Sequence, residues 1–342
     1  MGLKNYLPST YRWFIATSLS VGGILCSHLA FATPKQDPFD TLTIQLENSS
    51  VSTLQGASDK YYTNGIRVGW TSRTDSLPKP IADVNRFLLG DGMQRIHWGL
   101  QQLMFNPVDT QTVNRLPHDR PYAGVLLSTL NLISDTDTTR SVFGIQAGLM
   151  GPGALGRQVQ NGFHGIKGDN KILGWHNQLT NMPVFQVQMG RTWRYGIMHA
   201  GPVDFDVLPS ANGAAGDYKT YAQLGALLRF GQGLDSDFGP TRIGPGDDGT
   251  DAYVGTKTVN WYVFGGVDGQ GVAYNSTLQG NPINPHSQHV SKKWDVGEIL
   301  AGVAVIVKGY KLAYTQTWQT QEFNGQKGGL FNYGSVNISF KF

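Results

Sequence analysis

Three short segments of the sequence concentrate side chains that could do chemistry. The first begins with Glu47-Asn48-Ser49 and continues, after a loop, at residues 59–65. The second covers residues 119–124, and the third runs from residue 151 to 179 and is rich in glycine, carboxamides and histidine, including His164. An imidazole ionises near neutral pH, so a histidine in such a segment could move a proton during catalysis. The sequence has no G-x-S-x-G motif, so it does not indicate a serine nucleophile on a strand-to-helix turn.

The composition restricts the class of protein that carries these segments. Of the 342 residues, 40% are hydrophobic, 15% are charged and 11% are aromatic, and there are 44 Gly and 16 Pro. This share of glycine and proline is typical of many short extended segments joined by turns, and it argues against a helical bundle. The net charge of +3 is too small to indicate nucleic acid as a partner. The single cysteine excludes a disulfide framework and a cysteine-ligated zinc cluster.

Residues 1–32 have the layout of a secretory signal peptide, which is removed from the mature protein. Lys4 and Arg12 come first, an apolar stretch runs from Trp13 to Cys26, and Ala30-Phe31-Ala32 closes the segment. A membrane-anchor helix is the alternative, but glycine, serine and histidine dilute the apolar stretch. Cleavage after residue 32 would remove the cysteine and two positive charges, leaving one mature domain of residues 33–342 with a net charge of +1.

The elements that must position the chemical segments are strands, because apolar and polar residues alternate along the chain. In the final strand the apolar face carries Val336, Ile338, Phe340 and Phe342. The polar face carries Ser335, Asn337, Ser339 and Lys341. A terminal strand with this alternation, ending on phenylalanine, is typical of a transmembrane barrel. A half-buried strand of a soluble sandwich is the alternative, but it leaves the signal peptide unexplained.

Eleven further segments show the same alternation, so the total is twelve. They lie near residues 41–48, 60–73, 94–105, 120–133, 139–150, 184–194, 199–209, 218–230, 257–268, 295–307 and 309–321. A single-chain barrel with both ends in the periplasm requires an even number, and residues 272–278, a possible thirteenth strand, are therefore assigned to a loop. The sequence predicts an all-β fold: one twelve-stranded antiparallel transmembrane β-barrel of the bacterial outer membrane.

This topology assigns a side of the membrane to each connection. If the first strand runs outward from the periplasm, the odd-numbered connections are extracellular and the even-numbered ones periplasmic. All three chemical segments then face the cell surface, and the fifth connection, about residues 151–183, is the longest. A hairpin would place Asn48 and Thr63 side by side near the rim. The periplasmic connections at residues 74–93 and 231–256 are longer than such turns usually are.

Taken in order, the polar segments resemble the outer-membrane lipid A 3′-O-deacylases. The shared motifs are YYTNG at 61–65, DRPYAG at 119–124, a G-P-G…QVQN..H run at 151–164 and a GW..QL run at 174–179. The resemblance covers nearly the whole mature chain and implies a twelve-stranded barrel, in agreement with the strand count. It also implies a calcium-dependent esterase that removes the 3′-linked acyloxyacyl group of lipid A in the outer leaflet.

Four residues match catalytic positions of this family. His164 matches the catalytic histidine, Asn48 an active-site asparagine and Thr63 the threonine of the YTNG motif. Gln160 matches a polar residue just before the histidine. In the implied mechanism, neutral His164 takes a proton from water as the water attacks the ester carbonyl. A bound Ca²⁺ would polarise the carbonyl oxygen and stabilise the oxyanion.

The implied calcium site departs from the family pattern at one position. Asn48 and Thr63 are expected to contribute to it together with backbone carbonyls. Ser49, however, stands where the family commonly has aspartate. A hydroxyl is a much poorer ligand for a hard cation than a carboxylate. Asp59 or Asp169 could supply the missing charge.

Other charged residues in the three segments have both functional and structural interpretations. Arg157, Lys167 and Lys171 flank His164 and could contact the phosphates of lipid A, although a solvated loop would also carry such residues. Asp119 and Arg120 are expected to form an ion pair inside the rim that fixes the barrel wall, and contact with the substrate is the alternative.

The expected partners are lipid A, as part of lipopolysaccharide, and the outer membrane itself. Two other functions stay open. The first is a non-enzymatic barrel, structural or a narrow pore, which the Ser49 departure favours. The second is an outer-membrane phospholipase, for which the sequence offers no ordered Ser–His pairing. Acyl-chain specificity and oligomeric state are not indicated by the sequence.

Overall fold

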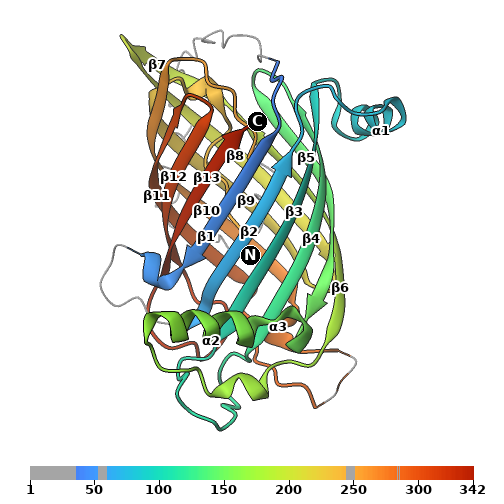
Figure 1. Ribbon diagram of the computed structural model, residues 1–342, viewed down its shortest axis with the longest axis vertical. Coiled ribbons are helices and arrows are strands. Elements are labelled where there is room, and N and C mark those ends of the chain that lie inside the picture. The colour runs from blue at the N-terminus through green and yellow to red at the C-terminus, as the bar shows by residue number, and fades with distance from the viewer. Residues whose placement is uncertain (1–35, 53–59, 244–250, 283, 285) are drawn as a thin grey trace, which may run out of the picture.

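The computed structural model describes residues 36–52, 60–243, 251–282, 284 and 286–342 (Figure 1). The segment predicted to be a signal peptide lies outside these residues. The described residues form an antiparallel sheet with the strands β1 (Thr41–Asn48), β2 (Tyr61–Thr71), β3 (Met93–Asn106), β4 (Ala123–Asp135), β5 (Thr139–Met150), β6 (Met182–Trp193), β7 (Tyr195–Ala200), β8 (Val203–Gly216), β9 (Lys219–Gln232), β10 (Val259–Asn275), β11 (Asp295–Val307), β12 (Tyr310–Gln319) and β13 (Phe331–Lys341).

The sheet closes into a twelve-stranded barrel. Neighbours in sequence pair from β1 to β6 and from β8 to β13, while β1 pairs with β13 and β6 with β8. The short β7 continues from β6 and pairs with the first residues of β8, so it adds no strand to the wall. The predicted all-β, twelve-stranded antiparallel barrel is confirmed.

Two expectations about strand limits were wrong. The strand predicted near residues 199–209 is β8, which begins at Val203 and continues to Gly216. Residues 272–275, assigned to a loop from the sequence, continue β10 beyond an irregularity between Val272 and Tyr274. Residues 276–279 then form the short helix α3 (Ser276–Gln279). The extra residues pair with the start of β9, so they lengthen an existing strand and leave the even count unchanged.

Side chains alternate between the two faces of the wall, as a strand period of two residues requires. On β1, Thr43 and Gln45 are buried inside the barrel, whereas Ile44 and Leu46 are exposed on the outside. The wall is therefore apolar on its outer face and polar on its lumen face, the pattern of a barrel that contacts lipid. Among the described residues, no helix is both long and apolar enough to span a membrane.

The long connection between β9 and β10 turns back into the barrel. We call its described parts, residues 233–243 and 251–258, the lumen segment; it includes the short helix η4 (Leu234–Ser236). Arg67 of β2 pairs with Asp251 at 2.6 Å, and both side chains are almost fully buried. The segment is long because it occupies the lumen, whereas a turn at the barrel edge needs only a few residues.

Further ion pairs hold the lumen segment to the opposite side of the wall. Asp237 accepts from Arg229 of β9 at 2.7 Å and from Lys311 of β12 at 2.5 Å. Burial disfavours the charged carboxylate of Asp237, but the charges of Lys311 and Arg229 outweigh it and hold its pKa well below the usual range. Since these strands and β2 lie on different parts of the barrel, the lumen segment crosses the interior.

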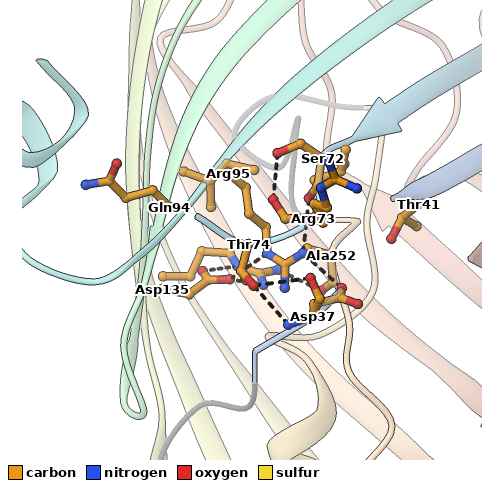
Figure 2. A network of polar contacts seen from close by, with 12 residues as sticks. Asp37, Thr41, Ser72, Arg73, Thr74, Gln94, Arg95, Asp135 and Ala252 are labelled. Carbon is orange, nitrogen blue, oxygen red and sulfur yellow. Dashed lines mark hydrogen bonds and ion pairs between the residues drawn. The ribbon is translucent and has the colours of Figure 1, made fainter. Parts of the chain in front are cut away.

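A second polar network holds the residues before β1 against the neighbouring strands. Figure 2 shows Asp37 beside Arg95, with a distance of 2.9 Å between the carboxylate and the guanidinium, and Thr74, whose hydroxyl accepts from the Asp37 amide at 2.9 Å. Asp37 also pairs with Lys341 near the end of β13. These contacts fasten the start of the wall to its last strand.

The helices lie at opposite ends of the barrel (Figure 1). α1 (Lys79–Leu89), in the connection between β2 and β3, stands at the same end as β7. The connection between β5 and β6 contains η2 (Pro152–Ala154), α2 (Gly156–Lys167) and η3 (Gly174–Asn177) at the other end. The short helix η1 (Ser49–Val51) follows β1. The three polar segments of the sequence therefore meet at the α2 end.

Candidate active site

Helix α2 is held close to the wall by two glycines. A Cβ atom on Gly124 of β4 would lie 3.2 Å from the backbone nitrogen of Gly156, and one on Gly156 would lie 2.9 Å from the ring of Trp175. A side chain at Gly156 would force the Trp175 ring to move, and one at Gly124 would press against the backbone of the helix. The helix ends at Gly168, which has φ of 78° and donates its N–H to the carbonyl of His164. The last glycine of the DRPYAG motif therefore serves to seat α2.

The helix covers the outer face of the wall. Gln102 of β3 donates to the carbonyl oxygen of Ala154 at 2.5 Å, and Asn106 donates to Oε1 of Gln160 at 3.1 Å. Leu103, which alternates with these residues, packs in the lumen instead. The segment from residue 151 to 179 therefore lies against the outside of the barrel and does not close its mouth.

Two of the predicted catalytic residues share the buried face of α2. His164 and Gln160 are one helical turn apart and are 7% and 4% exposed. Nδ1 of His164 lies 2.7 Å from the carbonyl oxygen of Asn170. A carbonyl can only accept, so Nδ1 carries the proton and Nε2 is the basic nitrogen of the neutral ring. Trp175 donates its indole N–H to Oε1 of Gln160 at 2.7 Å, which fixes the orientation of that carboxamide.

The other two predicted catalytic residues lie at the ends of β1 and β2. Asn48 pairs directly with Asn64, and its Nδ2 donates to Oδ1 of Asn64 at 3.0 Å. Oδ1 of Asn48 accepts from both the amide and the hydroxyl of Ser50 at 2.6 Å. Thr63 occupies the irregularity between Tyr62 and Asn64, where the pairing of β2 with β3 shifts by a residue.

The strand register relates these residues to α2. Asn64 lies between Asn48 on β1 and Met104 on β3. Asn106, which holds Gln160, is two residues further along β3, so the distance from β1 to the strand under α2 is two strand spacings, about 10 Å. The structure thus places all four predicted catalytic residues at one end of the barrel, on the two adjacent strands β1 and β2 and on the helix that covers the next strand, β3.

Several buried polar atoms in this region have no hydrogen-bond partner among the described residues. They include Oγ of Ser49, Oγ1 of Thr63, Nε2 of Gln160 and the Tyr122 hydroxyl. Ser49 and Thr63 are each 1% exposed. A native protein rarely buries a hydroxyl or carboxamide unless a partner, a water or a ligand satisfies it. These atoms therefore mark a place where a polar group beyond the described residues fits.

Comparison with known proteins bears on the identity of this arrangement. The model of the LpxR family, described as outer membrane protein LpxR, matches residues 15–342. The chain belongs to the LpxR family. The solved structure of LpxR from Salmonella typhimurium aligns with a TM-score of 0.73 and 22% identity, over 88% of this chain and 100% of that one. Membership identifies the chain as a bacterial outer membrane protein and agrees with the closed barrel.

Other barrels are more distantly similar in structure. The β domain of the Bordetella autotransporter BrkA aligns over 90% of this chain and 98% of its own, with 9% identity and a TM-score of 0.40. The NanC porin aligns over 89% of this chain and 100% of its own, with 7% identity and a TM-score of 0.34. Among curated proteins, none matches the sequence.

In the described residues of this LpxR family member, no cluster of acidic side chains marks a calcium site. These residues contain no group of three or more histidines, cysteines, aspartates or glutamates that could hold a metal ion. Glu47 faces the lumen, where it accepts from the Tyr62 hydroxyl and the Ile243 amide, each at 2.8 Å. Asp169 is exposed just after α2, and Asp59 lies outside the described residues. The remaining donors, Ser49 among them, are neutral, whereas Ca²⁺ prefers a site with carboxylates.

The sequence offered three basic residues near His164 as candidates for contact with phosphates. Arg157 and Lys171 are exposed, and the side chain of Lys167 lies outside the described part of the chain.

The expected ion pair between Asp119 and Arg120 was wrong. Arg120 instead pairs with Glu322 and donates to the Thr277 hydroxyl at 2.9 Å. The Asp119 carboxylate accepts from the backbone amides of Val108 and Arg120, at 2.8 and 2.7 Å. Asp119 lies in a bend before β4 and its carboxylate is occupied by these backbone amides, so the two charges find different partners.

Sequence reasoning missed three residues that belong to the site. Ser49 was noted only as a departure from the family, yet its hydroxyl is one of the partnerless atoms. Asn106 and Trp175 both hold the Gln160 carboxamide. The GW..QL motif drew attention to Trp175, but nothing in the sequence around Asn106 distinguishes it from other polar strand residues.

Proposed function

We propose that this LpxR family member is a lipid A 3′-O-deacylase, a carboxylic ester hydrolase in which His164 is the general base. The supporting observation is a buried histidine with a fixed tautomer, beside buried polar atoms that lack partners, on the outer face of the barrel wall. A site on that face is reached from the lipid layer. Its substrate is therefore an ester that a membrane lipid presents near the bilayer surface.

The chain's own residues suffice for a balanced hydrolysis. Nε2 of His164 takes a proton from water, and the water oxygen attacks the ester carbonyl carbon. The negative charge on the carbonyl oxygen accepts hydrogen bonds from the Gln160 carboxamide and from the hydroxyls of Ser49 and Thr63, the groups that lack a partner among the described residues. The bond between the acyl carbon and the sugar oxygen breaks, and protonated His164 returns the proton to that oxygen. The products are a free acyloxyacyl carboxylate and a 3′-hydroxyl.

Dependence on Ca²⁺ is a separate part of the proposal, and it rests on the family resemblance. Asn48 and Thr63 would offer neutral oxygens to the ion, and a carboxylate would come from Asp59 or Asp169. None of the steps above passes through a metal. Arg157, Lys167 and Lys171 would face the phosphates of lipid A from the loop around α2.

We place the α2 end of the barrel at the cell surface. An even number of strands puts both chain ends on one side, and in a barrel of this kind that side is the periplasm. The site then lies in the outer leaflet, where lipid A is found.

The alternative of an open pore is disfavoured by the lumen segment. Its ion pairs with Arg67 on one side and Lys311 on another keep it across the interior. A non-enzymatic structural barrel remains as the second candidate function, because Ser49 replaces the family's aspartate.

Mass spectrometry of lipid A tests the proposal. Cells that carry the wild-type protein should lose one 3′-linked acyloxyacyl unit, and cells that carry His164→Ala should retain it. His176→Ala is the matched control, because His176 is an exposed histidine on the same connection and is expected to leave deacylation unchanged. Undiminished deacylation by His164→Ala would refute His164 as base. Unchanged lipid A with the wild type, with or without phospholipid hydrolysis, would refute the deacylase.

A further inference from the structure

Helix α1 lies outside the barrel wall and is fastened to it along one face. Asn85 is buried, and its Nδ2 donates to the carbonyl oxygen of Ile133 on β4 at 3.0 Å. Leu89 is also buried, and its carbonyl oxygen accepts from Arg191 of β6 at 3.5 Å. In Figure 1 the helix stands out sideways from the wall, at the end opposite α2.

The two flanks of α1 differ in chemistry. One carries large apolar side chains open to the surroundings: Ile81 is 39%, Val84 50% and Phe87 88% exposed. At 3.6 residues per turn these three positions fall within an arc of about 120°. The other flank is charged, and Lys79 and Arg86 both pair with Asp83 there, at 2.8 and 3.4 Å.

The apolar flank continues the lipid-facing surface of the wall. Leu130 of β4 is 42% exposed on that surface, and its neighbours across the sheet, Trp98 and Ile145, are also exposed. Ile133, which accepts the hydrogen bond from α1, is three residues from Leu130, or about 10 Å along the strand. Helix α1 thus has an apolar flank next to the lipid-facing surface, a charged flank opposite it and a third face packed on the wall. This arrangement matches the boundary between the hydrocarbon layer and water.

We infer that α1 is an interfacial helix of the membrane leaflet at this end of the barrel. Ile81, Val84 and Phe87 enter the acyl chains, while Lys79 and Asp83 remain in the aqueous head-group region. In the topology proposed above, this is the periplasmic leaflet. The inference accounts for the length of the connection between β2 and β3, which a simple turn does not need, and it holds whether or not the barrel is an enzyme.

Single-cysteine labelling tests this placement, because the only cysteine of the sequence is Cys26. In a Cys26→Ser background, Phe87→Cys is labelled with a fluorophore, and the protein is reconstituted into phosphatidylethanolamine–phosphatidylglycerol vesicles. Lys79→Cys on the charged flank is the matched control, and Leu224→Cys, 70% exposed on the outer wall, is the lipid-facing reference. All three positions are exposed, so the substitutions should not disturb folding.

Acyl-chain-brominated lipids should quench the labels at positions 87 and 224 several-fold more than the label at 79. Aqueous iodide should quench the label at 79 most. Equal quenching of 87 and 79 by iodide would overturn the inference. Protection of position 87 from iodide without quenching by brominated lipid would also overturn it, because it would mean that a second copy of the chain covers the flank.

Discussion

The lumen and the outer site beneath α2 are both buried polar regions, on opposite faces of the same wall. In the lumen, charged groups are matched: Arg229 contacts both Asp206 and Asp237, and Arg67 contacts Asp251. The outer site holds neutral groups, and several of its polar atoms have no partner among the described residues. A buried charge without a partner is strongly destabilising, whereas a buried hydroxyl without one is tolerated at a smaller cost.

The difference shows that burial and polarity alone do not identify a functional residue. His97 in the lumen lies 2.9 Å from the Thr71 hydroxyl and 3.9 Å from Asp251, an arrangement that resembles a catalytic triad. The lumen segment that carries Asp251 encloses it, so these contacts serve to hold the segment in place. His164 and Thr63 remain the candidates for catalysis because polar atoms around them have no partner among the described residues.

The largest effect on stability is expected from breaking a lumen ion pair. Asp237→Ala removes the shared partner of Arg229 and Lys311 and leaves Lys311 buried without a counter-charge. We expect the free energy of unfolding to fall by about 3–5 kcal/mol, measured by denaturant unfolding in detergent. Asp235→Ala is the control, because that half-buried carboxylate accepts only from the Thr256 hydroxyl among the described residues. An equal loss of stability in both variants would mean that the ion pairs are not the main stabilising contacts in the lumen.

Two substitutions with smaller effects should distinguish the outer site from the lumen, because one should change the rate of hydrolysis and the other the stability. Thr63→Val removes a hydroxyl that has no partner in the described part of the chain, so we expect unchanged stability and a rate of ester hydrolysis lowered roughly ten- to hundredfold. Thr71→Val removes the hydroxyl bonded to His97, so we expect a loss of about 1 kcal/mol of stability and an unchanged rate. Initial rates on lipid A in micelles and thermal unfolding provide the two measurements. A loss of stability with Thr63→Val and a loss of rate with Thr71→Val would contradict the distinction between the outer site and the lumen.

The smallest effect is expected from adding a charge to the neutral site. Ser49→Asp restores the carboxylate found in the family and should strengthen Ca²⁺ binding roughly tenfold, measured by calorimetric titration of the folded protein. Ser49→Asn has nearly the same shape without the charge and should bind Ca²⁺ no better than the wild type. A gain with asparagine as large as with aspartate would show that shape, and not charge, controls the cation.

Much of the fold was predictable because the pattern that encodes it is local. Alternation along residues 41–48, 139–150 and 295–307 matches β1, β5 and β11 residue for residue. A strand that separates lipid from a polar interior must carry this alternation, whatever its neighbours are. The end of β10 was missed because residues 272–275 are strand only through their pairing with β9.

The residues of the candidate site were predictable from the sequence, but their arrangement in space was not. The motifs singled out Asn48, Thr63, Gln160 and His164, but nothing in the sequence indicates that α2 covers the outer face of the wall. That placement depends on the close approach of Gly124 to the start of the helix. The sequence also assigned Arg120 to the wrong partner, because its real partner, Glu322, is 202 residues away along the chain.

The sequence by itself determined the strands, their even number and which side chains face lipid, since these follow from a two-residue period. The tertiary structure alone decided what fills the lumen, which charges pair across it and which polar atoms lack a partner. Arg67 and Asp251, for example, are 184 residues apart and meet only after the barrel has closed around the lumen segment. Ion pairs and hydrogen bonds between residues far apart in the sequence form only in the closed barrel. These contacts distinguish the structural polar residues of this protein from the candidates for catalysis.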